Sequence, residues 1–591
     1  MGYKEKYLEW ISSPVFDEKT KDELIGIAED EKEIEDRFYK DLKFGTGGLR
    51  GVIGAGTNRM NVYTVTKATQ GLADYIISLG EEAMNRGVAI AFDSRRMSPE
   101  FSKSAALTLN ANGIRTYIFE SLRPTPELSF AVRRLNCIAG LVVTASHNPP
   151  EYNGYKVYWE DGAQITPPHD RNIMEYISRV TDFADIKGIS EDSAREKGLY
   201  NTVPESIDET YYSELIGQSI HPDIIKKTAD ELTVVYTPLN GTGNVPVREV
   251  LRRLGFTRVH TVEEQEKPDG NFPTVVTPNP ENKEAFTLAL KLAKNKDADL
   301  VLATDPDADR LGVYVKDENG TFKGTYLEDE ETYPYVGFTG NMTGALLEEY
   351  ILSEKKKTGT LPEKGVICST VVSTNLARAI ASGYGMEYVE TLTGFKYIGE
   401  QLRIIEEEGY KKKFVFGLEE SYGCLAGDYT RDKDACSAVV MLCEAAAYFK
   451  HGNRTLCDAM DDIYKKYGYY LEGAHSLTLK GADGDLKMKR IMENMRITPA
   501  KEIAGLSVVA VRDYQTNERR ELKTGSIDQT GLPKSNVIYY ELENDAWMAV
   551  RPSGTEPKVK FYCGVNERDM VSAAQRLERI KAYVGNADNF D

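Results

Sequence analysis

The sequence lacks an excess of basic residues. Its 591 residues include 92 Asp and Glu but only 73 Lys and Arg, which gives a formal net charge of −19. Proteins that bind nucleic acid or an anionic membrane surface through their overall charge are basic. We therefore expect neither nucleic acid nor a membrane as a partner, and any bound anion needs a local basic pocket.

Cysteine is scarce and scattered. The seven cysteines are odd in number, and no two of them have C-x-x-C spacing. This pattern excludes a disulfide framework and a zinc site built from thiolates. A reducing compartment is the environment that fits such a chain.

Long apolar runs and targeting signals are also missing. No apolar stretch reaches the roughly 18 residues of a membrane span. The N-terminal segment MGYKEKYLEWISS has no apolar signal-peptide core, and Lys6 stands where a myristoylation signal has Ser or Thr. We expect a cytoplasmic protein. Its 41% hydrophobic residues are typical of a folded globular chain, and its length suggests about four domains.

One strand, helix and strand pattern occurs three times. The copies cover residues 88–92, 99–112 and 114–119; residues 233–239, 247–254 and 256–262; and residues 366–370, 375–384 and 386–391. Each predicted helix ends at a glycine, the residue that best adopts the left-handed conformation there. These glycines are Gly113, Gly255 and Gly385. Alternation of apolar strands with helices indicates three related α/β domains with mostly parallel sheets.

The last part of the chain differs. From about residue 466, strand-like segments outnumber helices and follow one another directly, which favours a smaller α+β domain with antiparallel strands. The predicted fold class is therefore α/β with four domains: three similar α/β domains with mixed or parallel sheets, and a C-terminal α+β domain. The predicted boundaries are 1–208, 209–325, 326–465 and 466–591. Polar loops follow strands at 145–150, 305–310 and 417–421, and because ligands bind beyond the carboxyl ends of parallel strands, we expect these loops around a central cleft.

The most specific of these loops carries alternating aspartates. Asp305, Asp307 and Asp309 follow the apolar strand 300–304, and a tight loop aims such side chains at one centre. Dense carboxylate oxygens suit a hard cation such as Mg²⁺. A calcium-binding EF-hand loop is excluded, because Arg310 replaces the required Gly and Lys316 the required Glu.

Other polar residues are less specific by themselves. Ser146 lies in a turn after a strand, where a hydroxyl acts as a nucleophile only with help from a base or a metal, and most turn serines are structural. The segment 551–558 combines a guanidinium, hydroxyls and a glycine, which suits either a phosphate site or a polar hairpin turn. Glu419 and Ser421 suit sugar hydroxyls or an ordinary helix start.

Five motifs in a fixed order resemble the α-D-phosphohexomutase superfamily, and within it the bacterial-type α-phosphoglucomutases, a branch that also contains phosphopentomutases. The motifs are TASHNPPEYNGYK (144–156), DPDADR (305–310), TGFKYIG (393–399), GLEES (417–421) and RPSGTEPK (551–558). Together they span nearly the whole chain. The sequence departs from the family's pattern at two positions. Pro306 stands where many relatives have Gly, and Leu418 changes the shorter G-E-x-S motif to GLEES. Neither departure removes a side chain that the motifs require.

The resemblance implies a role for each matching residue. It implies a phosphoserine at Ser146 and Mg²⁺ held by this group with Asp305, Asp307 and Asp309. It places three residues near the proton transfers: His147, Lys156 and Lys396. It implies supporting positive charges at Arg50 and Arg310 and contacts to sugar hydroxyls from Glu419 and Ser421. It implies a grip on the second phosphate by Arg551, Ser553, Gly554, Thr555 and Lys558.

The implied reaction is the interconversion of glucose 1-phosphate and glucose 6-phosphate through glucose 1,6-bisphosphate. Partners would then be small sugar phosphates, and the chain a monomer or dimer. A phosphopentomutase or phosphomannomutase remains an alternative. Asp305 as an aspartyl-phosphate nucleophile is a further hypothesis, but such sites normally have Thr or Val where this chain has Asp309. A non-catalytic sugar-phosphate sensor is disfavoured by the retained Ser146 and aspartates.

Overall fold

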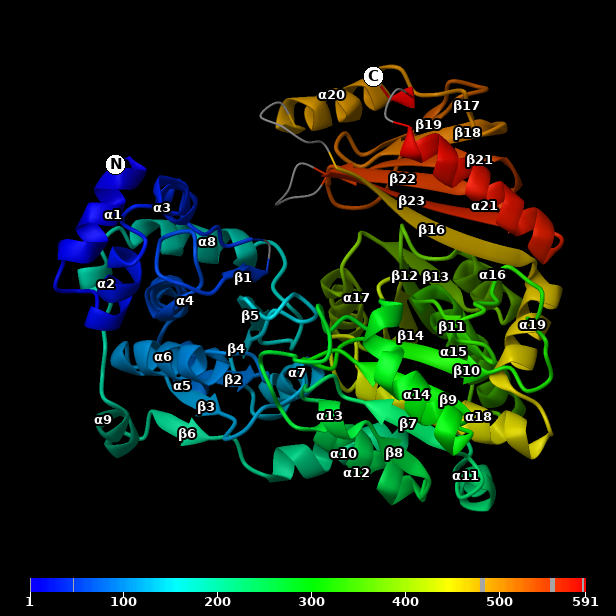
Figure 1. Ribbon diagram of the computed structural model, residues 1–591, viewed down its shortest axis with the longest axis horizontal. Helices are drawn as coiled ribbons and strands as arrows, with labels where there is room; N and C mark the ends of the chain where they lie inside the picture. Colours follow the sequence, from blue (N-terminus) through cyan, green and yellow to red (C-terminus); the bar gives the residue numbers. More distant parts are fainter. Residues whose placement is uncertain (1, 46, 479–483, 553–557, 587–588, 591) are drawn as a thin grey trace. The chain divides into compact units, whose positions relative to one another are not determined.

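The computed structural model describes residues 2–45, 47–478, 484–552, 558–586 and 589–590 (Figure 1). The chain divides into two compact units. The first unit comprises Met1–Gly312, Ile398–Gly409 and Gly423–Glu444. The second unit comprises Val313–Tyr397, Tyr410–Tyr422 and Ala445–Asp591. No helix among the described residues is both long and apolar enough to cross a membrane.

The first sheet is mixed and carries the Ser146 segment. Its strands are β1 (Gly48–Val52), β2 (Val88–Phe92), β3 (Thr116–Ile118), β4 (Ala139–Val143), β5 (Tyr152–Trp159) and β6 (Tyr200–Thr202), in the order β1-β5-β4-β2-β3-β6. The central strands β2 and β4 are parallel to each other, whereas β5 runs antiparallel to β4 and to β1. Every residue of β2 and β4 is buried, as expected for strands covered by helices on both faces. Its helices are α4 (Val62–Ser78), α5 (Glu81–Arg86), α6 (Ser98–Ala111), α7 (Thr125–Arg134), α8 (His169–Arg179) and α9 (Glu191–Glu196).

Three short helices precede this sheet. They are α1 (Tyr3–Ser12), α2 (Glu18–Ile25) and α3 (Glu31–Phe38). The side chains of Asp17 and Asp30 cap α2 and α3 by accepting backbone N–H groups. An aromatic cluster fills their interior, with the Trp10 ring stacked on Phe16 at a centroid distance of 4.1 Å. The charged residues and the helical spacing of apolar residues in 17–43 predict helices there, and α2 and α3 pack with α1 around one small core.

The second sheet carries the aspartate loop. Its strands are β7 (Val234–Thr237), β8 (Val259–Thr261), β9 (Leu300–Thr304), β10 (Leu311–Lys316) and β11 (Tyr335–Phe338). The strand β7 pairs in parallel with both β8 and β9. All of β9 is buried, and it ends one residue before Asp305. The accompanying helices are α10 (Ser206–Gly217), α11 (Pro222–Thr228), α12 (Asn244–Leu254), α13 (Glu263–Glu266) and α14 (Thr287–Lys296).

The third sheet repeats the parallel arrangement. Its strands are β12 (Gly365–Thr370), β13 (Glu387–Thr391), β14 (Lys413–Glu419) and β15 (Gly423–Ala426). The strand β12 pairs in parallel with both β13 and β14. Its helices are α15 (Gly340–Lys357), α16 (Asn375–Gly383), α17 (Phe395–Glu407), α18 (Ala435–His451) and α19 (Leu456–Tyr467).

The C-terminal sheet lies in the second unit and is antiparallel wherever its pairing is described. Its strands are β16 (Tyr469–Thr478), β17 (Glu502–Ile503), β18 (Leu506–Asp513), β19 (Glu518–Glu521), β20 (Ile527–Gln529), β21 (Ile538–Leu542), β22 (Trp547–Pro552) and β23 (Lys558–Glu567). The helices α20 (Gly484–Ile497) and α21 (Met570–Gly585) pack on it. This is the predicted α+β domain, and the predicted fold class is confirmed. The four domain boundaries stay predictions.

Three details of the predicted elements are wrong. The glycines of residues 44–52 predict a glycine-rich loop, but residues 48–52 form β1, because they pair antiparallel with β5. The strand β14 continues through Glu419, so the GLEES segment is not a loop from its first residue and does not start a helix. Arg551 belongs to β22, and Lys558 begins the paired strand β23. The first two differences come from pairing with the distant strands β5 and β12, and the third comes from pairing between the consecutive strands β22 and β23.

Candidate functional site

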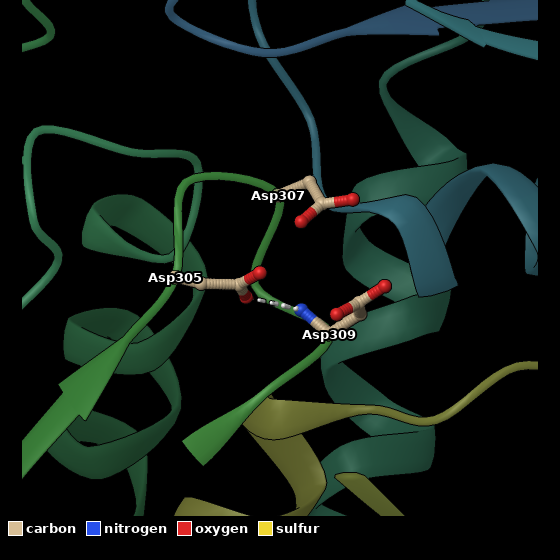
Figure 2. Close-up of side chains that lie close together, drawn as sticks. All are labelled: Asp305, Asp307 and Asp309. Atoms are coloured by element: carbon tan, nitrogen blue, oxygen red, sulfur yellow. Dashed lines mark hydrogen bonds between the residues drawn. The ribbon is translucent and has the colours of Figure 1, made fainter. Parts of the chain in front are cut away.

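The three aspartates of the 305–310 loop lie together in the first unit. Their carboxylates converge on one space (Figure 2), and each offers an oxygen within 4.8 Å of the others. All three residues are at most 1% exposed. The loop closes on itself, since Asp305 Oδ1 accepts the backbone N–H groups of Asp309 (3.1 Å) and Arg310 (3.0 Å). The fold therefore concentrates three acidic groups in a buried position.

Two lysines from distant segments approach these carboxylates. Lys156 Nζ, on β5, lies 2.7 Å from Asp307 Oδ2 and 3.4 Å from Asp309 Oδ2. Lys433 Nζ lies 3.1 Å from Asp309 Oδ2. Asp307 Oδ1 and Asp309 Oδ1 are buried and have no hydrogen-bond partner among the described residues. Two acceptor oxygens of the cluster thus have no hydrogen bond among the described residues and can accept one from a ligand or bind a cation.

Ser146 lies beside the aspartates. Its hydroxyl donates to Asp305 Oδ2 at 2.6 Å and lies 3.1 Å from His147 Nδ1. The residue is 3% exposed and has a left-handed backbone, with φ of +50°. Its backbone N–H donates to Thr144 Oγ1 at 2.8 Å. The fold therefore brings a hydroxyl, an imidazole and the three carboxylates into one site.

The charges of this cluster shift its ionisations. Burial, together with the charges of Asp307 and Asp309, raises the pKa of Asp305 well above its usual range. Although burial opposes it, the Lys156 ammonium lowers the pKa of Asp307. Burial and the nearby Arg310 guanidinium lower the pKa of His147 well below its usual value, so its ring is neutral at pH 7. The site therefore combines carboxylates under mutual repulsion with an uncharged imidazole.

The two predicted supporting arginines belong to the same unit. Arg50, on β1, donates to Asn148 Oδ1 at 3.1 Å, two residues after Ser146. Arg310 donates to Glu281 and lies 3.8 Å from Asp309 Oδ1 through its Nε. The Arg50 guanidinium thus contacts the segment that carries Ser146, and the Arg310 guanidinium lies beside one of the three aspartates.

The remaining predicted residues lie in the second unit. At the end of β14, the Ser421 hydroxyl donates to Glu419 Oε1 at 2.7 Å. Lys396, on α17, lies 5.1 Å from the centroid of the Tyr397 ring. Arg551 and Lys558 are half-buried on neighbouring strands. Ser553, Gly554 and Thr555 lie outside the described residues.

Sequence reasoning missed three residues of the first unit. Lys433 contacts Asp309, Thr125 Oγ1 donates to Asp307 Oδ2 at 2.9 Å, and Arg95 Nη2 donates to the Ser146 carbonyl at 2.6 Å. The charged run 431–434 before an apolar helix is a sequence signal for Lys433. Thr125 has no distinctive local pattern, since only the fold brings it to Asp307.

Known proteins resemble this chain over most of its length. Three models of the phosphoglucomutase/phosphomannomutase family match: α/β/α domain I at residues 41–183, domain II at 210–320 and domain III at 339–467. A Staphylococcus epidermidis phosphoglucomutase is 36% identical, with 92% of this chain and 94% of the relative covered. A Staphylococcus aureus phosphoglucomutase is 38% identical, with coverage of 93% and 95%.

A solved structure shares the fold. The open form of parafusin, a phosphoglucomutase from Paramecium, matches with a TM-score of 0.67 at 16% identity, and the match covers 93% of this chain and 96% of that one. The family predicted from the five sequence motifs is confirmed. The chain belongs to the phosphoglucomutase/phosphomannomutase family of the α-D-phosphohexomutase superfamily, and within it to the phosphoglucomutase type.

Proposed function

We propose that this enzyme interconverts α-D-glucose 1-phosphate and glucose 6-phosphate through a phosphoserine at Ser146 and a glucose 1,6-bisphosphate intermediate. The observation that carries the proposal is the 2.6 Å contact between the Ser146 hydroxyl and the buried carboxylate of Asp305. The names of the relatives at 36–38% identity support glucose as the sugar. Its partners are then small sugar phosphates.

The aspartate cluster fits a Mg²⁺ ion. All its ligand atoms are carboxylate oxygens, the type that Mg²⁺ prefers, and two of these buried oxygens have no hydrogen-bond partner among the described residues. Asp305, Asp307, Asp309 and the phosphorylated Ser146 would hold the ion. When bound, Mg²⁺ neutralises negative charge on the transferring phosphoryl group.

Phosphoryl transfer then depends on groups around Ser146. The bond between Ser146 Oγ and phosphorus breaks as a free hydroxyl oxygen of the sugar phosphate forms its bond to the same phosphorus. The proton of that hydroxyl passes to a base of the site. In the second transfer the bisphosphate presents its other phosphate to Ser146, so the bond between that phosphorus and the sugar oxygen breaks as the bond to Ser146 Oγ forms, and the released sugar oxygen takes up a proton. His147 Nδ1, 3.1 Å from Ser146 Oγ, suits the exchange of a proton with the serine oxygen.

The lysines contribute charge and donors. Although burial opposes it, the carboxylates of Asp307 and Asp309 raise the pKa of Lys156, so its ammonium is charged at pH 7. Together with Lys433 it offsets negative charge in the cluster, which otherwise repels a phosphate. We propose the residues of the second unit as substrate contacts, with Glu419 and Ser421 for the sugar hydroxyls.

The experiment that tests the sugar assignment compares kcat/KM for glucose, mannose and ribose 1-phosphates with Mg²⁺ and a catalytic amount of the matching bisphosphate. The proposal predicts the highest value for glucose 1-phosphate. A clear preference for ribose 1-phosphate identifies a phosphopentomutase, and a preference for mannose 1-phosphate identifies a phosphomannomutase. Absence of turnover with all three sugars contradicts the enzymatic proposal and favours a sensor.

A further inference from the structure

A buried arginine lies under the segment that carries Ser146. Arg95 follows β2, and 1% of its surface is exposed. Its Nη1 donates to the carbonyls of Pro149 (2.8 Å) and Tyr152 (3.0 Å). Its Nη2 donates to the carbonyls of Ser146 (2.6 Å) and Asn148. One guanidinium thus holds four carbonyl groups of a seven-residue segment, which its planar set of donors permits.

The conformation of Ser146 makes these contacts significant. A positive φ is unfavourable for a serine and persists where the surroundings determine it. Its carbonyl is held by Arg95, while its N–H is held by the Thr144 hydroxyl. Both backbone groups of Ser146 are therefore fixed from the interior, and the side chain is left to donate to Asp305.

Asp93 connects the two supports. Its Oδ2 accepts the Thr144 hydroxyl at 2.6 Å and lies 3.4 Å from Arg95 Nε. Its Oδ1 accepts the Arg95 backbone N–H at 2.9 Å and the Ser98 hydroxyl at 2.8 Å. All four residues are at most 1% exposed. The network is thus a rigid unit between β2 and the end of β4.

The surroundings keep Arg95 away from substrate. The ring of the buried Phe272 lies 5.1 Å from its guanidinium carbon, and its donors are directed at backbone carbonyls. The hydrogen bonds of its guanidinium therefore act on Ser146 through the loop that they hold.

We propose that Arg95 is a positioning residue for Ser146, holding the 146–152 segment in the backbone conformation that directs Oγ to Asp305. The expected loss of activity rests on the proposed phosphoserine function, whereas the expected change in the 146–152 segment can be measured without turnover. Loss of the guanidinium releases the segment, so Ser146 exchanges phosphate more slowly while the affinity for sugar phosphate is retained.

The first test measures the segment itself. Arg95→Lys replaces a planar five-donor group with an ammonium that cannot span four carbonyls. Arg96→Lys is the matched control, because the neighbouring Arg96 is exposed and gives the same segment one contact, to the Pro150 carbonyl at 3.1 Å. Amide hydrogen exchange of residues 145–152 is expected to be at least about tenfold faster in Arg95→Lys and unchanged in Arg96→Lys. Equal protection in both variants overturns the proposal.

The second test measures the chemistry. The expected result for Arg95→Lys is a kcat lower by about 100-fold, the effect of a misplaced reacting group, with KM for glucose 1-phosphate changed by less than about threefold. The rate of phosphate transfer from Ser146 to the sugar phosphate in a single turnover should fall in parallel. A raised KM with unchanged kcat contradicts a positioning role.

A second variant keeps the test decisive if Arg95→Lys does not fold. Thr144→Val removes the hydroxyl that joins Asp93 to the Ser146 amide while keeping a similar shape, and it should lower kcat in the same direction by about tenfold. Unchanged kcat and exchange in Thr144→Val overturn the proposal. Full turnover without phosphate on Ser146 in the unaltered protein instead contradicts the proposed function, so the two failures are distinct.

Discussion

The first unit holds three buried carboxylates close together, and neighbouring groups stabilise them. Asp305, Asp307 and Asp309 are buried and mutually repulsive, and they are stabilised in part by Lys156, Lys433 and backbone N–H groups. Two of their oxygens still have no hydrogen-bond partner among the described residues, so the cluster can accept a further positive ligand.

A variant of Asp307, one of the proposed metal ligands, tests this conclusion. Asp307→Asn removes one charge from the cluster, and the Mg²⁺ concentration for half-maximal activity should rise by about tenfold or more. A chelator should abolish activity in the unaltered protein, and Mg²⁺ should restore it. Asp299→Asn, at the opposite end of β9, is the control and should leave the Mg²⁺ requirement unchanged. An equal Mg²⁺ requirement in the two variants contradicts the assignment.

A carboxyl group of the second unit gives a pH prediction. Burial raises the pKa of Glu472, on β16, to about 7, and its Oε1 has no hydrogen-bond partner among the described residues. The folded state therefore favours the protonated form. Below its ordinary pKa of 4.5 this group costs no stability, and stability is lost as the pH rises from there through about 7.

Glu472→Gln should remove that part of the pH dependence. The decrease in Tm between pH 5 and pH 8 is expected to be smaller in this variant than in the unaltered protein. Glu493→Gln, an exposed carboxyl on α20, should keep the original decrease. If Glu472→Gln and Glu493→Gln give the same decrease, the carboxyl of Glu472 is not the group responsible.

Strands and helices show which parts of the fold the sequence predicts well. The apolar runs of β2 and β9 mark both strands to the residue, because strands buried on two faces need continuous apolar side chains. The strand β1 was not predicted because it contains Gly48, Arg50 and Gly51, which do not form an apolar strand pattern. Its extended conformation depends on pairing with β5. The same reason applies to the extension of β14 through Glu419.

Glycine at the end of a predicted helix is the clearest local signal. Gly255 follows α12 with φ of +97°, as the pattern predicts, and a Cβ there would meet no atom within 4 Å. Gly255→Ala should therefore destabilise the protein by about 1 kcal/mol through backbone strain alone. Gly188 also has open space but no positive φ, so Gly188→Ala should be neutral or slightly stabilising. Denaturant unfolding of the two variants provides the comparison, and equal stabilities contradict the strain argument.

Only some residues of the candidate site can be predicted from such local patterns. The alternating aspartates and Ser146 stand in recognisable loops, so their types and neighbours suggested the chemistry. Arg95 and Thr125 reach the same site through tertiary packing, and a single arginine or threonine after a strand gives no comparable signal. Packing between distant segments therefore determines what the sequence pattern leaves open.

The state of the cysteines agrees with the prediction made from their spacing. All seven cysteines are buried and none is in a disulfide, as their scattered spacing predicts. The family models account for three α/β domains, whereas residues 2–40 lie before the first matched region and form helices around an aromatic cluster, against which Tyr63 and Phe183 also pack. The first unit holds Ser146, its supports and the aspartates, which makes it the centre of the proposed chemistry.

We propose that Ser146 carries the transferred phosphoryl group, and the rest of the proposed reaction depends on this role. The most direct measurement is incubation with glucose 1,6-bisphosphate labelled in its phosphates, followed by acid treatment and identification of the labelled peptide. We expect acid-stable label on Ser146 that passes to added glucose 1-phosphate, and neither label nor turnover in Ser146→Ala. Acid-labile label on Asp305, or undiminished turnover in Ser146→Ala, would contradict it.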